Sequence, residues 1–158
     1  MNPDRKAGMT APPVRCTLCP RCCHADRTAS AGFCGGGPKV RVARAMLHQW
    51  EEPPLVGKNG AGAVFFSGCP LGCVFCQNAA VSHGNYGVTL EDGELCAVFR
   101  RLCGAGCATL DLVSPTQYLP WIADALDELR HTFPGRVPPI VYNTGGYERA
   151  ETLRRYEG

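Results

Sequence analysis

Eleven cysteines among 158 residues constrain this chain more than any other feature of its sequence. An odd number of cysteines cannot all pair within one chain, and clustered cysteines in a reducing compartment are more often metal or cluster ligands than disulfides. The N-terminal stretch from Met1 to Pro13 lacks the apolar segment of a signal peptide. We therefore expect a cytoplasmic protein that keeps its cysteines reduced.

Composition and charge argue against several other classes of protein. Hydrophobic residues make up 45% of the chain and charged residues 19%, so a hydrophobic core can form and disorder is not expected. No apolar run reaches the roughly 18 to 20 residues of a membrane-spanning helix. A net charge of +2 is too small to indicate nucleic-acid binding. We expect neither a membrane nor a nucleic acid as a partner.

Positive charge is concentrated in the N-terminal part of the chain. Residues 1–48 carry eight Lys and Arg against two Asp and Glu, whereas residues 49–158 carry eight against twelve. The basic part also holds the cysteines at positions 16, 19, 22, 23 and 34. Thiolates around a metal carry excess negative charge, and Arg15, Arg21 and Arg27 are candidates to balance it. The alternative interpretation is a solvated basic tail.

The sequence divides into three regions. Residues 1–12 are a polar lead that we expect to be flexible, residues 13–60 are a cysteine-rich section, and residues 61–158 repeat a strand, loop and helix pattern. The apolar stretch Val40–Trp50 in the second region is compatible with a helix or a strand. It ends before Pro53, because proline breaks either element.

Three strand and helix units are predicted in the third region. The strands are expected over residues 63–66, 110–113 and 139–142, and the helices over 89–104, 120–129 and 147–156. Repeated units of this kind imply parallel strands with right-handed crossovers, which is an α/β fold. A complete eight-unit barrel takes roughly 250 residues. We therefore expect a partial (β/α) barrel and interpret the chain as the N-terminal part of a longer protein.

The sharpest motif comes directly after the first of these strands. Cys69, Cys73 and Cys76 form a C-x3-C-x2-C pattern on a short loop. A cubane iron–sulfur cluster normally takes four cysteines, so three thiolates predict a cluster with one iron open to a cofactor or substrate. Gly68 and Gly72 allow the backbone to fold around such a cluster. A zinc site would more often show two C-x2-C pairs.

The loop resembles the motif of the radical S-adenosylmethionine (SAM) superfamily, which has this spacing and an aromatic residue before the last cysteine, here Phe75. Further segments look like the uncharacterised radical SAM proteins related to pyruvate formate-lyase activating enzyme. These segments are residues 15–23, 32–34, 51–57, 65–69, 143–144 and 146–147. The similarity runs from about residue 15 to the last residue, and members of the family are about twice as long.

The chain departs from the family pattern at two places. Cys22 and His24 stand where a polar residue and a glycine are expected. The Gly-Gly-Glu motif that many activating enzymes carry after the second strand is absent, and Ser114-Pro115-Thr116 occupies its place. The second departure concerns how the amino group of SAM is held, and not how the cluster is held.

The resemblance implies a [4Fe-4S] cluster on Cys69, Cys73 and Cys76, with SAM bound at the open iron. It implies an enzyme that reductively cleaves SAM to a 5′-deoxyadenosyl radical, and we expect this chain alone to show weak activity at most. The implied partners are an electron donor such as flavodoxin or ferredoxin and a protein substrate of glycyl-radical type. The candidates for contacting SAM at the carboxyl ends of the strands are Ser114, Thr116, Asn143, Thr144 and Gly145.

A second group of cysteines lies in the N-terminal section. Its members are Cys16, Cys19, Cys23 and Cys34, with Cys22 as an alternative ligand. Four ligands suffice for a closed site that holds either zinc or a second iron–sulfur cluster, and free thiols are the remaining alternative. Cys96, Cys103 and Cys107 fall in or beside a helical apolar stripe, so we expect them to be small core residues.

Two other classes of function remain open from the residues alone. One is an iron–sulfur module that transfers electrons without cleaving SAM, and the other is a domain that uses zinc structurally. An electron carrier would complete its cluster with a fourth cysteine, and none follows Cys76 within the loop. The sequence indicates no catalytic side chain.

Overall fold

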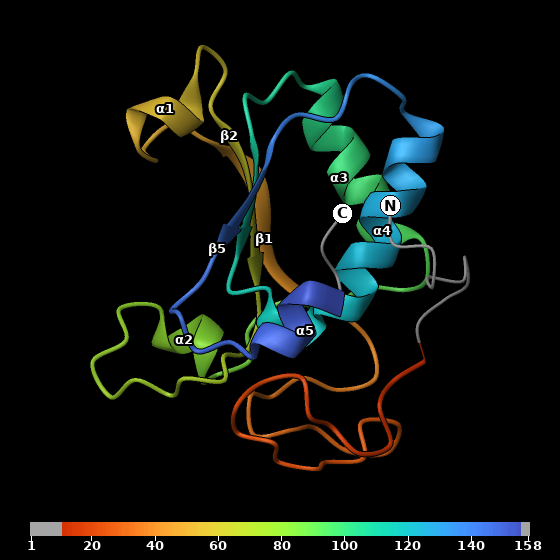
Figure 1. The fold of residues 1–158 in the computed structure, drawn as a ribbon. Coiled ribbons are helices and arrows are strands. Elements are labelled where there is room, and N and C mark those ends of the chain that lie inside the picture. The colour runs from red at the N-terminus through yellow and green to blue at the C-terminus, as the bar shows by residue number, and fades with distance from the viewer. Residues whose placement is uncertain (1–10, 156–158) are drawn as a thin grey trace.

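The computed structural model describes residues 11–155, which form an α/β fold around one five-stranded mixed sheet (Figure 1). The strands are β1 (Arg41–His48), β2 (Ala61–Phe66), β3 (Val88–Thr89), β4 (Leu110–Val113) and β5 (Ile140–Asn143). The helices are α1 (Pro53–Val56), α2 (Ala79–Ser82), α3 (Glu94–Gly104), the 3-10 helix η1 (Thr116–Tyr118), α4 (Leu119–Thr132) and α5 (Ala150–Arg155). In the sheet, the strands follow the order β3-β1-β2-β4-β5.

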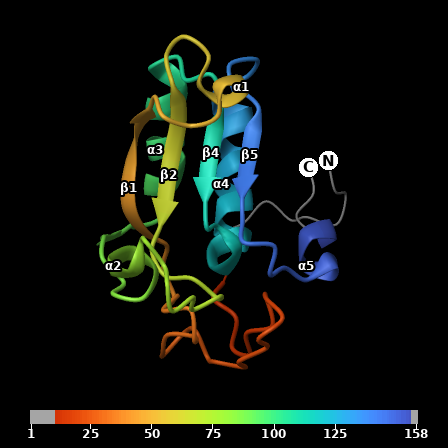
Figure 2. The same cartoon turned by 90° about the vertical axis from the view of Figure 1, so that its left-hand side faces the viewer.

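The parallel part of the sheet agrees with the prediction. Strand β2 pairs in parallel with β4, and β4 pairs in parallel with β5. Helix α3 lies between β2 and β4 in the chain, and α4 lies between β4 and β5. Both helices cover the same face of the sheet (Figure 2). The carboxyl ends of the three parallel strands therefore meet at one edge, as an α/β fold requires.

Strand β1 resolves the ambiguous stretch Val40–Trp50 and adds a feature that the repeat pattern did not predict. It pairs antiparallel with β2, placing Met46 opposite Ala63, and antiparallel with the short β3. The chain reverses between β1 and β2 through the proline-containing α1. The sheet is consequently mixed, because a short connection favours antiparallel neighbours.

Two predicted helices begin later than their sequences suggested. The helix expected from residue 89 starts at Glu94, because Thr89 pairs with Arg41 in the sheet. The Glu94 carboxylate accepts a 2.7 Å hydrogen bond from the backbone N–H of Glu91, which ties the first residue of the helix to the turn before it. The helix expected over 147–156 runs over α5, and its last expected residue falls outside the described part of the chain.

The core lies between the sheet and the two long helices. Helix α3 contributes Leu95, Phe99 and Leu102, α4 contributes Ile122, Leu126 and Leu129, and the strands contribute Val64, Phe66, Leu110 and Leu112. Cys96, Cys103 and Cys107 belong to the same buried cluster, which confirms them as core residues. Burial raises the pKa of Cys103 to about 11, so this side chain remains a neutral thiol.

Residues 11–40 form neither helix nor strand and pack beneath the carboxyl edge of the sheet (Figure 2). Backbone hydrogen bonds hold this segment together, including Cys16 N–H to Ala25 C=O and Gly32 N–H to Gly36 C=O. The expected flexible lead over 1–12 falls largely outside the described residues. Among the described helices, none has the length and apolar character needed to cross a membrane.

Candidate functional site

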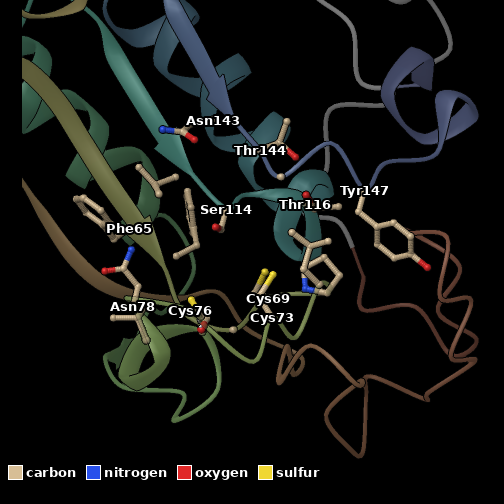
Figure 3. A pocket seen from close by; sticks show the side chains of 18 of the residues that line it. Phe65, Cys69, Cys73, Cys76, Asn78, Ser114, Thr116, Asn143, Thr144 and Tyr147 are labelled. Carbon is tan, nitrogen blue, oxygen red and sulfur yellow. Dashed lines mark hydrogen bonds between the residues drawn. The ribbon is translucent and has the colours of Figure 1, made fainter. Parts of the chain in front are cut away.

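A cavity of about 250 Å³ opens where β2, β4 and β5 end (Figure 3). It is lined by all three cysteines of the C-x3-C-x2-C loop, Cys69, Cys73 and Cys76. It is also lined by the residues singled out from the strand ends, Ser114, Thr116, Asn143, Thr144 and Gly145. The structure therefore brings together around one space eight residues that span more than seventy positions of the sequence.

Local backbone geometry explains how the cysteine loop reaches the cavity. Gly68 and Gly72 both adopt positive φ, at 82° and 69°, which residues with a Cβ rarely do. These turns fold the loop back beneath the end of β2. The backbone N–H of Gly68 donates to Val81 at 2.9 Å, and the Ser82 hydroxyl donates to the Cys76 sulfur at 3.2 Å. Helix α2 thus supports the loop from one side.

A buried glutamine fixes the start of this loop to the neighbouring strand. The Gln117 side-chain amide donates to the carbonyl oxygens of Ser67, Gly68 and Ser114, at 3.1, 2.9 and 2.9 Å. These carbonyls follow β2 and β4, so one side chain ties the two strand ends together. Sequence patterns gave no sign of this role, because Gln117 lies in η1, outside the regular helix and strand repeats.

Arg21 braces the loop from the N-terminal segment. Its guanidinium donates to the backbone carbonyls of Pro70 and Leu71, the second at 2.7 Å. It also stacks on the ring of Phe33, with 3.6 Å between the guanidinium carbon and the ring centroid. Arg21 was expected to balance thiolate charge, but its hydrogen bonds go to these carbonyl oxygens. Its main role in the structure is to position the loop.

Arg27 is fully buried and joins the N-terminal segment to α4. Its guanidinium donates to the Gly37 carbonyl at 3.1 and 2.8 Å and to the Gln117 carbonyl at 2.5 Å. It also lies over the ring of Trp121, 4.8 Å from the centroid. A solvated basic tail is therefore the wrong interpretation of this arginine.

A hydrogen-bonded group at the cavity joins two predicted residues, Thr116 and Thr144, to Glu148, which was not predicted. Glu148 accepts hydrogen bonds from the hydroxyls of Thr116, at 2.7 Å, and Thr144. The Tyr142 hydroxyl donates to Thr116 at 3.2 Å. Burial raises the pKa of Tyr142, which therefore acts as a hydrogen-bond donor and not as a base. The only sequence signal for Glu148 is its place four residues after Thr144.

The donor atoms around the cavity fit the groups that the sequence predicts. Three thiols are suitable ligands for an iron–sulfur cluster, and the hydroxyl and amide groups opposite them can bind a polar cofactor. Ser114 adopts positive φ at 54° and donates its backbone N–H to the Asn143 carbonyl, which joins the ends of β4 and β5. As the side chains stand, however, no three Cys, His, Asp or Glu among residues 11–155 surround a common metal position.

The N-terminal cysteines are neighbours of one another and lie outside the cavity lining. Cys16 is buried, Cys19, Cys22 and Cys34 are half-buried, and Cys23 is exposed. Burial raises the pKa of Cys34, although the nearby Gly36 N–H and Arg27 act to lower it. The segment that carries them touches the cysteine loop directly, since the Cys69 N–H donates to the Cys34 carbonyl at 3.1 Å.

Asp111 is an unpartnered carboxylate on β4, two residues before the cavity-lining Val113. Its side chain is fully buried, and neither oxygen has a hydrogen-bond partner of normal geometry among the described residues, although the nearby Asn143 side chain acts to lower the pKa of Asp111. Burial, together with the nearby charge of Glu51, raises its pKa from 3.8 to about 6. The folded protein therefore binds this proton more tightly than the unfolded chain does. The resulting stability is complete below pH 3.8 and is lost as the pH rises through 6.

We expect Asp111→Asn to stabilise the protein at pH 8 by about 2 kcal/mol more than at pH 4, because the amide carries no charge to bury. Urea unfolding of variant and wild type at the two pH values measures this difference. Asp92→Asn, at an exposed site, is the matched control. Equal stabilisation by Asp111→Asn at both pH values would contradict the raised pKa.

Comparison with known proteins gives limited similarity. No family model matches the chain, and no solved structure matches it. An uncharacterized protein of Methanocaldococcus jannaschii is 33% identical over 77 residues. The matched stretch is 49% of this chain, and it spans about a fifth of the relative's length, 22%.

Proposed function

We propose that this chain is the N-terminal part of a radical SAM enzyme related to pyruvate formate-lyase activating enzyme, built on a partial (β/α) barrel. The observation that carries the proposal is the shared cavity. Three thiols from one loop and five residues from the ends of β4 and β5 line it together. In an α/β fold, ligands bind at the carboxyl ends of parallel strands.

Cys69, Cys73 and Cys76 would hold a [4Fe-4S] cluster through their sulfur atoms. When bound, the cluster would supply one-electron reduction of SAM, the chemistry that yields methionine and a 5′-deoxyadenosyl radical. The electron is supplied by a reduced donor such as flavodoxin or ferredoxin. The protein contributes the placement of both groups, since the difficult chemistry belongs to the cofactors.

The chain's own residues are arranged to bind and orient SAM. Asn143 and Thr144 line the cavity at the end of β5, across from the loop that carries the three cysteines (Figure 3). Glu148 holds the Thr144 and Thr116 hydroxyls in place and offers an acceptor for the SAM ammonium group. This carboxylate supplies the negative charge that the absent Gly-Gly-Glu motif supplies in many activating enzymes. Gly145 packs directly against Leu71, whose side chain lies where a Cβ at this position would be.

Anaerobic reconstitution with iron and sulfide tests the function. We expect about four irons and four sulfides bound at the cysteine loop, as a cubane requires. We also expect SAM to change the electron paramagnetic resonance signal of the reduced cluster. With dithionite, 5′-deoxyadenosine should form, and Glu148→Gln should weaken SAM binding without lowering the iron content.

Two results would contradict the proposal and point to another function. A cluster whose signal is unchanged by SAM would indicate an electron-transfer module. Zinc at the loop without iron or sulfide would indicate a structural metal domain. Both measurements use the chain as it stands, so they do not depend on substrate turnover. We propose that the substrate is a protein of glycyl-radical type, and neither of these measurements requires it.

A further inference from the structure

Four cysteines of residues 11–40, Cys16, Cys19, Cys23 and Cys34, lie close to one another in the structure. The sulfurs of Cys23 and Cys34 lie 3.4 and 3.6 Å from the position that a Cβ would take at Gly32. The Cys16 thiol is within hydrogen-bonding reach of Cys23, and Cys19 is a further neighbour of both. Four sulfurs from three turns of the chain thus converge on one part of the segment.

The backbone around these cysteines repeats one local arrangement. His24 follows Cys23 with φ of 54°, and Gly35 follows Cys34 with φ of 78°. The positive φ turns the chain so that the amide two positions after the cysteine faces its sulfur. At Cys34 this gives a hydrogen bond of 3.4 Å from the Gly36 N–H, and the N–H of Ala25 interacts with Cys23 in the same way.

Cys19 has the corresponding amide, since the N–H of Arg21 interacts with its sulfur. Three of the four cysteines therefore have the backbone N–H of the residue two positions later directed at their sulfur. Amides placed in this way stabilise a thiolate, which is the form of cysteine that binds metal. Neutral thiols need no such arrangement, because they are weak acceptors.

A positively charged side chain, Arg27, lies beside the four N-terminal cysteines. The buried Arg27 guanidinium lies 2.7 Å from the Cβ position of Gly36, and the Cys34 sulfur lies 3.3 Å from that same position. The arginine therefore borders one of the sulfurs while its hydrogen bonds go to Gly37 and Gln117. A divalent ion held by four thiolates keeps a net negative charge, and a neighbouring guanidinium offsets it.

We propose that Cys16, Cys19, Cys23 and Cys34 bind one zinc ion as a closed tetrathiolate site. Adjacent sulfurs suit ligands of a single ion, whereas a cubane places each cysteine on a different iron. The side chains do not yet surround one point, so the ion draws them together by rotation of the side chains. The segment forms no helix or strand, and the ion supplies stability that its small core does not.

Cys22 is excluded from the site by its other contacts. Its sulfur donates to the Cys19 carbonyl at 3.5 Å and lies 3.2 Å from the Arg149 guanidinium, which donates to it. Arg149 also donates to the Thr17 carbonyl at 3.2 Å. Cys22 therefore serves as a contact between the N-terminal segment and the residues before α5, and it provides an internal control.

Alkylation mapping on the wild-type chain tests the site without any substitution. The metal-free protein is treated with one equivalent of Zn²⁺ and then with N-ethylmaleimide, and modified cysteines are identified by mass spectrometry. We expect Zn²⁺ to slow modification of Cys16, Cys19, Cys23 and Cys34 by at least tenfold and to leave Cys22 unchanged. Unchanged rates at these four cysteines, or protection of Cys22 in place of one of them, would overturn the proposal.

Metal analysis separates this site from the cysteine loop. In the background Cys69→Ala, Cys73→Ala and Cys76→Ala, we expect one bound zinc per chain, lost with Cys34→Ser and kept with Cys22→Ser. Iron and sulfide in place of zinc in this background would overturn the proposal. Because the loop cysteines are absent, the result does not depend on whether the chain binds or cleaves SAM.

Discussion

Replacing Cys69, Cys73 and Cys76 together with alanine is expected to abolish the loop cluster. All three cysteines line the cavity, and no fourth cysteine among residues 11–155 lines it. A cluster that depends on three thiolates has no substitute ligand when they are removed. We expect the iron at this site to fall from about four atoms per chain to none, with loss of the brown colour and of SAM-dependent signals.

Val74→Ala is the matched control for this experiment. Val74 lies in the same loop between two of the cysteines, and its side chain is 97% exposed. Its truncation changes no buried contact, so we expect the iron content to match that of wild type. If the triple variant keeps four irons per chain beyond those of any N-terminal cluster, the loop does not hold the cluster and the proposed function is wrong.

The parallel half of the fold was predictable because short apolar runs typical of strands alternate along the chain with apolar stripes typical of helices. Short apolar runs at residues 63–66 and 110–113 and the stripe after Pro120 match β2, β4 and α4. The start of α3 was not predictable, since Thr89 has the form of a helix cap but pairs with Arg41. That pairing joins residues 48 positions apart, and local patterns carry no information about it.

The candidate site was predictable where spacing or strand position identified it, and not where long-range contacts made it. The cysteine spacing and the strand ends identified eight residues that line the cavity. Glu148 and Gln117 were missed, and Arg21 was singled out for charge balance and not for its contact with the loop. These roles depend largely on carbonyl and hydroxyl groups that are distant in the sequence. Arg21 reaches Leu71 across 50 positions, and Gln117 reaches Gly68 across 49.

The backbone of the N-terminal segment lies directly against the start of the cysteine loop, where Cys34 meets Gly68 and Cys69. A Cβ at Gly68 would lie 2.1 Å from the carbonyl oxygen of Cys34, a distance that no packing allows. The same carbonyl accepts a hydrogen bond from the Cys69 N–H, so neither segment can move away without losing this bond. Gly68 also has a φ of 82°, a conformation that alanine disfavours.

Gly68→Ala is therefore expected to destabilise the protein by about 3 to 5 kcal/mol, from the overlap with Cys34 and the strained φ together. For a chain of this size that corresponds to a melting temperature lower by roughly 10 °C, measured by circular dichroism. Gly104→Ala at the end of α3 meets no atom within 4 Å and is expected to change stability by less than about 1 kcal/mol. Because Gly68 directs the chain into the cysteine loop, the variant should also lose iron on reconstitution, whereas Gly104→Ala should retain it. Equal melting temperatures for the two variants would show that the N-terminal segment does not press against the loop in solution.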